Sequence, residues 1–219
     1  MRAAYQEELT EIQEGLIQMA ELVVEAVHQA TKALLTADVR TAEDVIAGDQ
    51  AIDDARNQLD KQVLVLLARQ TPVAGDLRTV VATLRLLAEL ERMGDLAAHI
   101  AKIARMRFPE PAVPEALRPN FERMAEVAEK MVTSASQNLR DRDIEVFDRI
   151  LDQDEETDEL RRRQFHMLLG EEWSHGVEAA VDVALLGRYY ERIADHAATL
   201  ARRVVFIVTG KDPGGALAR

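Results

Sequence analysis

Apolar residues recur at steps of three and four along most of this chain, which predicts long amphipathic helices rather than strands. The first series covers roughly residues 4–35 and includes Leu9, Ile12, Leu16, Met19 and Val23. The second series runs to about residue 68 and includes Val45, Ile52, Leu59, Val63 and Leu66. Asp38 stands directly before the second series and is its predicted N-cap. The first seventy residues therefore predict two helices joined by a short turn.

A third helix is expected over about residues 72–107. Thr71 is its predicted N-cap and Pro72 its first helical residue, because proline is well tolerated at that position. On this helix Leu86, Leu90, Met93, Ala97 and Ile100 form one apolar stripe, which we expect to face the core. Three prolines within residues 108–114 then end the helical pattern.

The second half of the chain repeats the first. Asp38 corresponds to Asp143 and Asp49 to Asp154 at a shift of 105 residues, and Glu91 corresponds to Glu191 at a shift of 100. A repeat of this length is far too long for a solenoid, so it indicates a tandem duplication. The predicted fold is all-α, with six helices in two three-helix bundles over residues 1–108 and 115–210, and a disordered tail over residues 211–219.

Composition and charge narrow the function. The 219 residues carry a net charge of −12, which argues against binding the nucleic-acid backbone and suits cations or a basic protein surface. The chain has no cysteine, which excludes thiolate metal sites, disulfides and a cysteine nucleophile. The first residues do not resemble a signal peptide, and no apolar run is long enough to span a bilayer. We therefore expect a soluble cytoplasmic protein.

Two sets of carboxylates occupy matching positions in the repeats. Each set has two acids four residues apart on the second helix of its unit and two more on the third. Antiparallel neighbours would bring Asp53 level with Glu91 to within about 3 Å along the helix axis, at 1.5 Å per residue from the turn at Thr71. The candidate metal ligands are Asp49, Asp53, Glu91 and Asp95 in the first unit and Asp154, Asp158, Glu191 and Asp195 in the second.

Four clustered carboxylates repel one another, and hard cations such as Mg²⁺, Mn²⁺, Ca²⁺ or iron would relieve the repulsion, with Zn²⁺ as a further candidate. The small residues Gly94, Ala98, Ala194 and Ala198 on the same side leave room for an ion or a partner, although they also permit close helix packing. The alternative is a solvated acidic face paired with Arg56, Arg92 and Arg192.

No other motif carries chemistry as clearly. Glu25-x-x-His28 and Glu172-x-x-His175 have the spacing of di-iron bundles but do not correspond within the repeat, so chance explains them better. His99 and His196 flank the carboxylates and read best as ordinary surface residues. There is no phosphate-binding glycine loop or catalytic triad, so we predict a non-enzymatic protein. A metal-dependent enzyme and a metal-free structural module are the alternatives.

Three segments together resemble the PhoU family of bacterial phosphate-signalling regulators: Gln70-Thr-Pro-Val-Ala-Gly-Asp-Leu-Arg78, Leu90-Glu-Arg-Met-Gly-Asp95, and Tyr190-Glu-Arg-Ile-Ala-Asp-His196. The resemblance extends from the start of the chain to the closing Thr209-Gly210. It implies two similar three-helix bundles, with multinuclear iron or zinc clusters in some members and magnesium, manganese or no metal in others. The eight carboxylates fall on the family's metal-binding motifs.

The resemblance also implies a role. Family members act as negative regulators of the phosphate-starvation response and of phosphate uptake. They are adaptors between a phosphate ABC transporter, through its ATPase, and a phosphate-sensing histidine kinase, and they reach the membrane only through these partners. A homodimer is expected. The second unit departs from the family pattern where it has Trp173-Ser-His-Gly-Val-Glu-Ala-Ala, as expected if one bundle is specialised.

Overall fold

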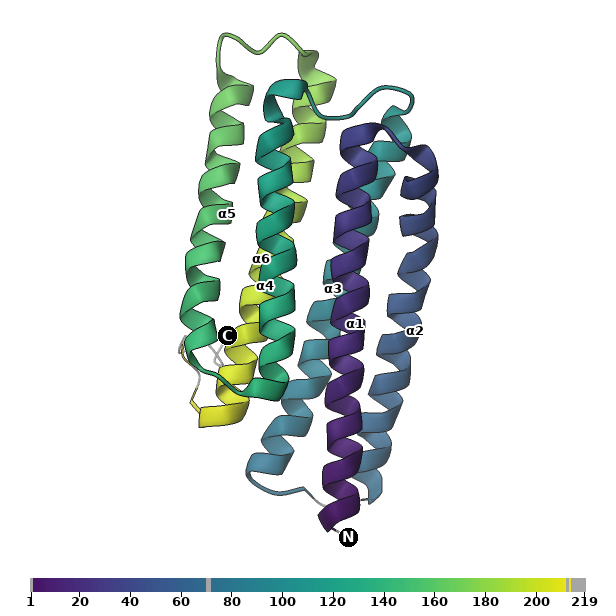
Figure 1. Cartoon of the computed structure of the whole chain (residues 1–219), viewed down its shortest axis with the longest axis vertical. Coiled ribbons are helices and arrows are strands. Elements are labelled where there is room, and N and C mark those ends of the chain that lie inside the picture. Colours follow the sequence, from purple (N-terminus) through teal and green to yellow (C-terminus); the bar gives the residue numbers. More distant parts are fainter. Residues whose placement is uncertain (1, 70–71, 212, 214–219) are drawn as a thin grey trace.

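Long helices make up nearly all of the computed structural model, which describes residues 2–69, 72–211 and 213 (Figure 1). No strand occurs in this part of the chain. The helices are α1 (Arg2–Thr36), α2 (Val39–Arg69), α3 (Gly75–Arg107), the short 3₁₀ helix η1 (Glu115–Leu117), α4 (Arg118–Asp141), α5 (Glu145–Leu169) and α6 (Gly176–Thr209). The predicted all-α fold of two three-helix units is confirmed.

The first turn of each unit shows the duplication in atomic detail. Asp38 accepts hydrogen bonds from the backbone N–H groups of Arg40 (3.1 Å) and Thr41 (3.2 Å), so the predicted N-cap is confirmed. Asp143 accepts the corresponding bond from Glu145 (2.9 Å) at the start of α5. The residues before these caps, Ala37 and Arg142, both adopt the left-handed conformation, with φ of 52° and 55°. The shift of 105 residues therefore holds for the backbone as well as for the sequence.

The start of α3 differs from the prediction. Thr71 lies outside the described residues. Pro72 is not helical, and α3 begins three residues later, at Gly75. Ala74 has φ of 47°, and Asp76 donates its backbone N–H to the carbonyl of Val73 (3.1 Å). A left-handed residue cannot continue a right-handed helix, so this turn separates Pro72 from α3. The break at residues 108–114 is confirmed, whereas the predicted tail lies largely outside the described residues.

The two units lie side by side and run in opposite directions (Figure 1). Helices α1, α3, α4 and α6 form the centre, where α3 packs against α6 and α1 against α4, and α2 and α5 lie on opposite flanks. One continuous cluster of buried apolar residues passes through all six long helices. The predicted stripe belongs to it, since all five of its residues are fully buried: Leu86, Leu90, Met93, Ala97 and Ile100.

Polar side chains also join the units inside this core. The hydroxyls of Thr31 on α1 and Tyr190 on α6 lie 2.7 Å apart, and both residues are buried. A buried tyrosine hydroxyl needs such a partner, so this bond fixes the relative position of the two helices. None of the described helices combines the length and apolar character that crossing a membrane would require.

Candidate functional site

The first acidic cluster comprises Asp49 and Asp53 on α2 and Glu91 and Asp95 on α3. Burial raises the pKa of Asp49, and the nearby charges of Asp95, Asp53 and Glu91 raise it further. Gly94 explains how the two helices come close enough for this. A Cβ atom on Gly94 would lie 2.9 Å from Cδ1 of Ile52 and 3.3 Å from Oδ1 of Asp49, so only glycine leaves the α2 side chains in place.

The second acidic cluster comprises Asp154 and Asp158 on α5 and Glu191 and Asp195 on α6. Burial raises the pKa of Asp154 to about 6, together with repulsion from Asp195, Asp158 and Glu191. Burial and the charge of Glu191 also raise the pKa of Asp195. All four carboxylates therefore lie within electrostatic reach of one another.

The two clusters share one electrostatic pattern. The strongest acidic influence on Asp49 comes from Asp95, and the strongest on Asp154 comes from Asp195. These pairs correspond at the shifts of 105 and 100 residues that relate the second and third helices of the units. Asp95 and Asp195 are thus corresponding acids that raise the pKa of the corresponding residues Asp49 and Asp154.

The two clusters differ in how their charge is neutralised. Glu191 is mostly buried, with 12% of its side chain exposed, and it forms ion pairs with Nη1 of Arg161 (2.5 Å) and Nη1 of Arg188 (2.6 Å). Ala88 occupies the position of Arg188 in the first unit, and Arg56, the counterpart of Arg161, donates a hydrogen bond to its neighbour Asn57 instead. The first acidic cluster therefore lacks the two cations that pair with Glu191 in the second.

In the first unit Arg92 forms ion pairs with two acids of the cluster. Its Nη1 lies 3.1 Å from Oδ2 of Asp95 and its Nε lies 3.9 Å from Oε2 of Glu91, but 64% of its side chain is exposed. Exposed ion pairs of this kind contribute at most about 1 kcal/mol to stability. The positive charge of Lys102 lowers the pKa of Asp49, but it only partly offsets the rise caused by burial and the acidic neighbours.

The carboxylates are suitable ligands for a hard cation, but their side chains do not point to a common position where one could bind. In the described residues, no three His, Asp or Glu side chains lie close enough together to hold a metal ion as they stand. Carboxylate oxygens are the ligands that Mg²⁺, Mn²⁺ and Ca²⁺ prefer. In the first acidic cluster, Glu91 and Asp95 can turn away from the exposed Arg92 without breaking a buried ion pair. In the second, Glu191 would have to leave two arginines.

The histidines near the clusters serve the interface between the units instead. Nδ1 of His196 lies 2.7 Å from Oε2 of Glu89 on α3, and the ring of His99 packs on that of Tyr189 with centroids 5.5 Å apart. The small residues pack closely, since Gly94, Ala98, Ala194 and Ala198 are all buried.

The Glu-x-x-His spacings do not form sites. His28 faces Glu129 of α4, with its Nδ1 3.3 Å from Oε1, and His175 packs on Trp173 with ring centroids 5.0 Å apart.

Two residues that contact the second acidic cluster are not among the candidates found from the sequence, namely Arg161 and Arg188. Arg188 stands three residues before Glu191, a helical spacing that favours an ion pair, whereas Arg161 comes from a different helix and gives no local signal.

Comparison with known proteins gives a consistent result over the whole chain. The family model described as "PhoU domain" matches twice, over residues 16–104 and 121–204. The chain is 46% identical over 213 residues to the phosphate-specific transport system accessory protein PhoU homolog 2 of Mycobacterium tuberculosis, covering 97% of this chain and 100% of that protein. It is 45% identical to homolog 1 of Mycobacterium leprae, covering 97% and 96% of the two chains.

Solved structures agree with this comparison. The crystal structure of the phosphate transport system regulatory protein PhoU from Streptococcus pneumoniae superimposes with a TM-score of 0.86 at 25% identity, covering 95% of this chain and 98% of that one. PhoU from Pseudomonas aeruginosa gives a TM-score of 0.85 at 26% identity, covering 94% and 100%. Both three-helix units and their arrangement are therefore shared with these proteins.

Proposed function

The chain belongs to the PhoU family, and we propose from this that it is a negative regulator of phosphate uptake and of the phosphate-starvation response. The observation that supports this best is the 46% identity to a phosphate-specific transport accessory protein over nearly the full length of both chains. Its relatives are named as accessory and regulatory proteins, and this chain is accordingly a regulator of phosphate transport rather than an enzyme.

In this proposal the protein is a cytoplasmic adaptor between the ATPase of a phosphate ABC transporter and a phosphate-sensing histidine kinase, and it acts as a homodimer. Its acidic surface suits a basic partner surface, since the net charge is −12. It would meet the membrane only through these partners.

In this proposal, cation binding at the acidic clusters would regulate the contact with a partner. Each would hold iron, zinc, manganese or magnesium through its four carboxylates, and the bound cation would supply the positive charge that removes their mutual repulsion. The first acidic cluster is the stronger candidate because two arginines already neutralise Glu191 in the second. Glu91 and Asp95 would turn toward Asp49 and Asp53, which would fix the face of α2 and α3 that a partner contacts.

A deletion strain tests the regulatory role. Without this protein, a phosphate-starvation reporter should be active in phosphate-rich medium, and the wild-type gene should restore repression. The metal-binding role predicts that Asp49→Asn with Asp95→Asn fails to restore repression while Asp60→Asn, outside the cluster on α2, succeeds. A reporter that stays repressed in the deletion strain would contradict the regulatory role itself.

Metal analysis of the purified protein tests the clusters separately. Mass spectrometry of native protein should detect bound metal, and Mn²⁺ or Mg²⁺ should raise the melting temperature of wild type but not of Asp95→Ala with Asp195→Ala. Protein that contains no metal and melts at the same temperature with and without Mn²⁺ or Mg²⁺ would favour the metal-free module.

A further inference from the structure

A continuous groove runs along the line where α1 meets α2. It consists of three hollows of about 820, 410 and 400 Å³. The first two share Glu11, Gln58 and Gln62, and the second and third share Leu22. Between Glu8 at one end and Gln29 at the other, the groove spans about 30 Å of α1 at 1.5 Å per residue.

The floor of this α1–α2 groove is apolar. Ile12, Met19, Ile52 and Leu59 line it and are buried within the first unit. Leu22 lies where two hollows meet and is 42% exposed, whereas its counterpart in the second unit, at a shift of 105 residues, is almost fully buried. Val65, which lines the largest hollow, is 44% exposed, so the groove leaves apolar surface open at more than one point.

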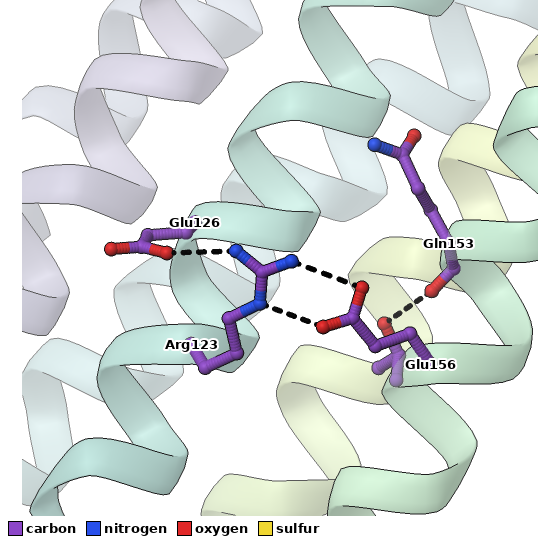
Figure 2. A network of polar contacts seen from close by, with 5 residues as sticks. Arg123, Glu126, Gln153 and Glu156 are labelled. Atoms are coloured by element: carbon purple, nitrogen blue, oxygen red, sulfur yellow. Dashed lines mark hydrogen bonds and ion pairs between the residues drawn. The ribbon is translucent and has the colours of Figure 1, made fainter.

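The corresponding line between α4 and α5 is bridged by polar side chains (Figure 2). Nε and Nη2 of Arg123 on α4 donate to the two carboxylate oxygens of Glu156 on α5, at 2.7 and 3.1 Å, while its Nη1 donates to Glu126. Nearby, Nε2 of Gln164 on α5 donates to Oδ1 of Asn120 on α4 at 2.6 Å. These bonds tie α4 to α5, at the surface through Arg123 and beneath it through the buried Gln164.

The first unit has none of the residues that bridge α4 and α5 at the matching positions of α1 and α2. At the shift of 105 residues, Arg123 and Glu156 correspond to Gln18 and Ala51, and Asn120 and Gln164 correspond to Gly15 and Leu59. All four first-unit residues line the groove: Gly15, Gln18, Ala51 and Leu59. Gly48 lines it as well. A Cβ atom on Gly48 would meet nothing within 4 Å. The duplication thus shows a closed and an open version of the same surface.

The charge of the groove indicates what it would accept. Its lining contains six acids and two bases, and both bases lie in the largest hollow: Glu8, Glu11, Glu14, Glu25, Asp44 and Asp54, with Lys61 and Arg69. Glu14 is paired with Arg140 of α4 at 2.6 Å. Within the described residues, no ion pair neutralises the other five acids.

We propose that the α1–α2 groove binds a basic amphipathic helix of a partner protein. The apolar face of that helix would cover Leu22 and the floor, its small side chains would fit against Gly48 and Ala51, and its Lys and Arg residues would meet the acidic rim. A groove of about 30 Å accommodates a helix of about 20 residues. The identity of the partner rests on the proposed adaptor role, whereas the binding chemistry does not.

Closing the groove by transplanting the bridge from the second unit tests the proposal. The double variant Gln18→Arg with Ala51→Glu places the Arg123–Glu156 pair between α1 and α2 without changing the net charge. The probe is a labelled 20-residue peptide with Leu and Ala on one helical face and Lys on the other. By fluorescence anisotropy at 150 mM salt, the double variant should bind the peptide at least tenfold more weakly than wild type.

Two controls separate the groove from general attraction to an acidic protein. A scrambled peptide of the same composition should bind wild type at least tenfold more weakly, because it has no apolar face. Arg123→Gln with Glu156→Ala, also neutral in charge, should leave affinity for the α1–α2 groove unchanged. Hydrogen exchange should show protection by the peptide on α1 and α2.

Other outcomes would overturn the proposal. Equal affinity of wild type and the closed variant, or equal binding of the two peptides, would show attraction by charge alone. A dimer that dissociates in the closed variant would assign the groove to a second copy of this chain. If the closed variant binds no peptide but restores phosphate repression in a deletion strain, the groove is not the partner site and the regulatory role stands.

Discussion

Arg107, the last residue of α3, donates hydrogen bonds from Nε and Nη2 to the carboxylate of Asp182 in the first part of α6, at 2.5 and 3.2 Å. At the other end of the same helix pair, Arg78 donates to the backbone carbonyl of Ile207 at 3.2 and 3.3 Å. The two contacts hold opposite ends of α3 on α6. The two contacts use corresponding positions of the repeat. At the shift of 100 residues, Arg78 corresponds to Glu178, which Arg107 also binds, and Arg107 corresponds to Ile207, which Arg78 binds.

Removing the cation from the first contact should destabilise the protein. Asp182 is only 3% exposed, so Arg107→Met leaves a buried carboxylate without its partner, at a cost of about 3 kcal/mol. For a chain of this size we expect the melting temperature to fall by roughly 6–12 °C. The position of Asp182 is Ala82 in the first unit, so Arg107→Met with Asp182→Ala should recover most of the loss. A double variant no more stable than the single one would contradict this explanation.

The second acidic cluster should make metal-free protein less stable as the pH rises. The pKa of Asp154 is raised to about 6 on folding, so the native state binds more protons than the unfolded state between about pH 4 and 6. The contribution of Asp154 to stability should therefore fall across this range and be lowest above pH 6. After allowance for partial hydration of the carboxylate, the effect is about 1–2 kcal/mol.

Asp154→Asn removes this repulsion and tests the effect directly. In chelator and low salt, it should raise the urea midpoint at pH 7.5 and reduce the loss of stability between pH 4 and 6. Asp152→Asn, at an exposed site two residues earlier on α5, is the matched control and should change neither. Parallel pH profiles for wild type and Asp154→Asn would contradict the assigned repulsion.

The contact between Gly94 and Ile52 predicts a coupling that can be measured. In an exposed helix, Gly→Ala stabilises by about 1 kcal/mol, but at Gly94 the new Cβ atom would lie 2.9 Å from Cδ1 of Ile52. Overpacking of this kind costs about 1–3 kcal/mol, so Gly94→Ala alone should gain nothing. In the background of Ile52→Val, which lacks Cδ1 but keeps Cγ2 at 3.2 Å, the same change should be more favourable by about 1 kcal/mol than in wild type. Equal effects in both backgrounds, measured by urea unfolding, would rule out the contact.

The unequal clusters predict unequal affinities for a cation. In an electron paramagnetic resonance titration with Mn²⁺, we expect the tighter site to disappear in Asp95→Ala. Arg188→Ala places the first unit's residue in the second acidic cluster and removes one of the two cations on Glu191. This change should tighten the weaker site about tenfold, equivalent to about 1.4 kcal/mol. An unchanged weaker site would show that Arg188 does not limit binding.

The features that could be predicted from the sequence are those set by residues close together in the chain. The helical periodicity predicts the spans of the helices, the cap at Asp38 and the buried stripe through Leu90, because each depends on neighbours within a few turns. The start of α3 was misplaced because the left-handed turn at Ala74 overrides the preference of Pro72 for a first helical turn.

The arrangement of the units could not be predicted in this way. It depends on contacts such as Thr31 with Tyr190, 159 residues apart, which no local pattern encodes. The same is true of the charge balance at Glu191, because Arg161 reaches it from another helix. Predicting the acids is therefore easier than predicting which of them remain free to bind a cation.

The buried core that passes through both repeats without interruption has a practical consequence. A fragment cut at the proline-rich connection would expose the apolar faces of α3 and α1 that otherwise meet α6 and α4, so neither half should persist alone as a folded piece. A cation bound at either acidic cluster would therefore raise the melting temperature of the entire protein. Although the gene was doubled, we expect its product to unfold as a single thermodynamic unit.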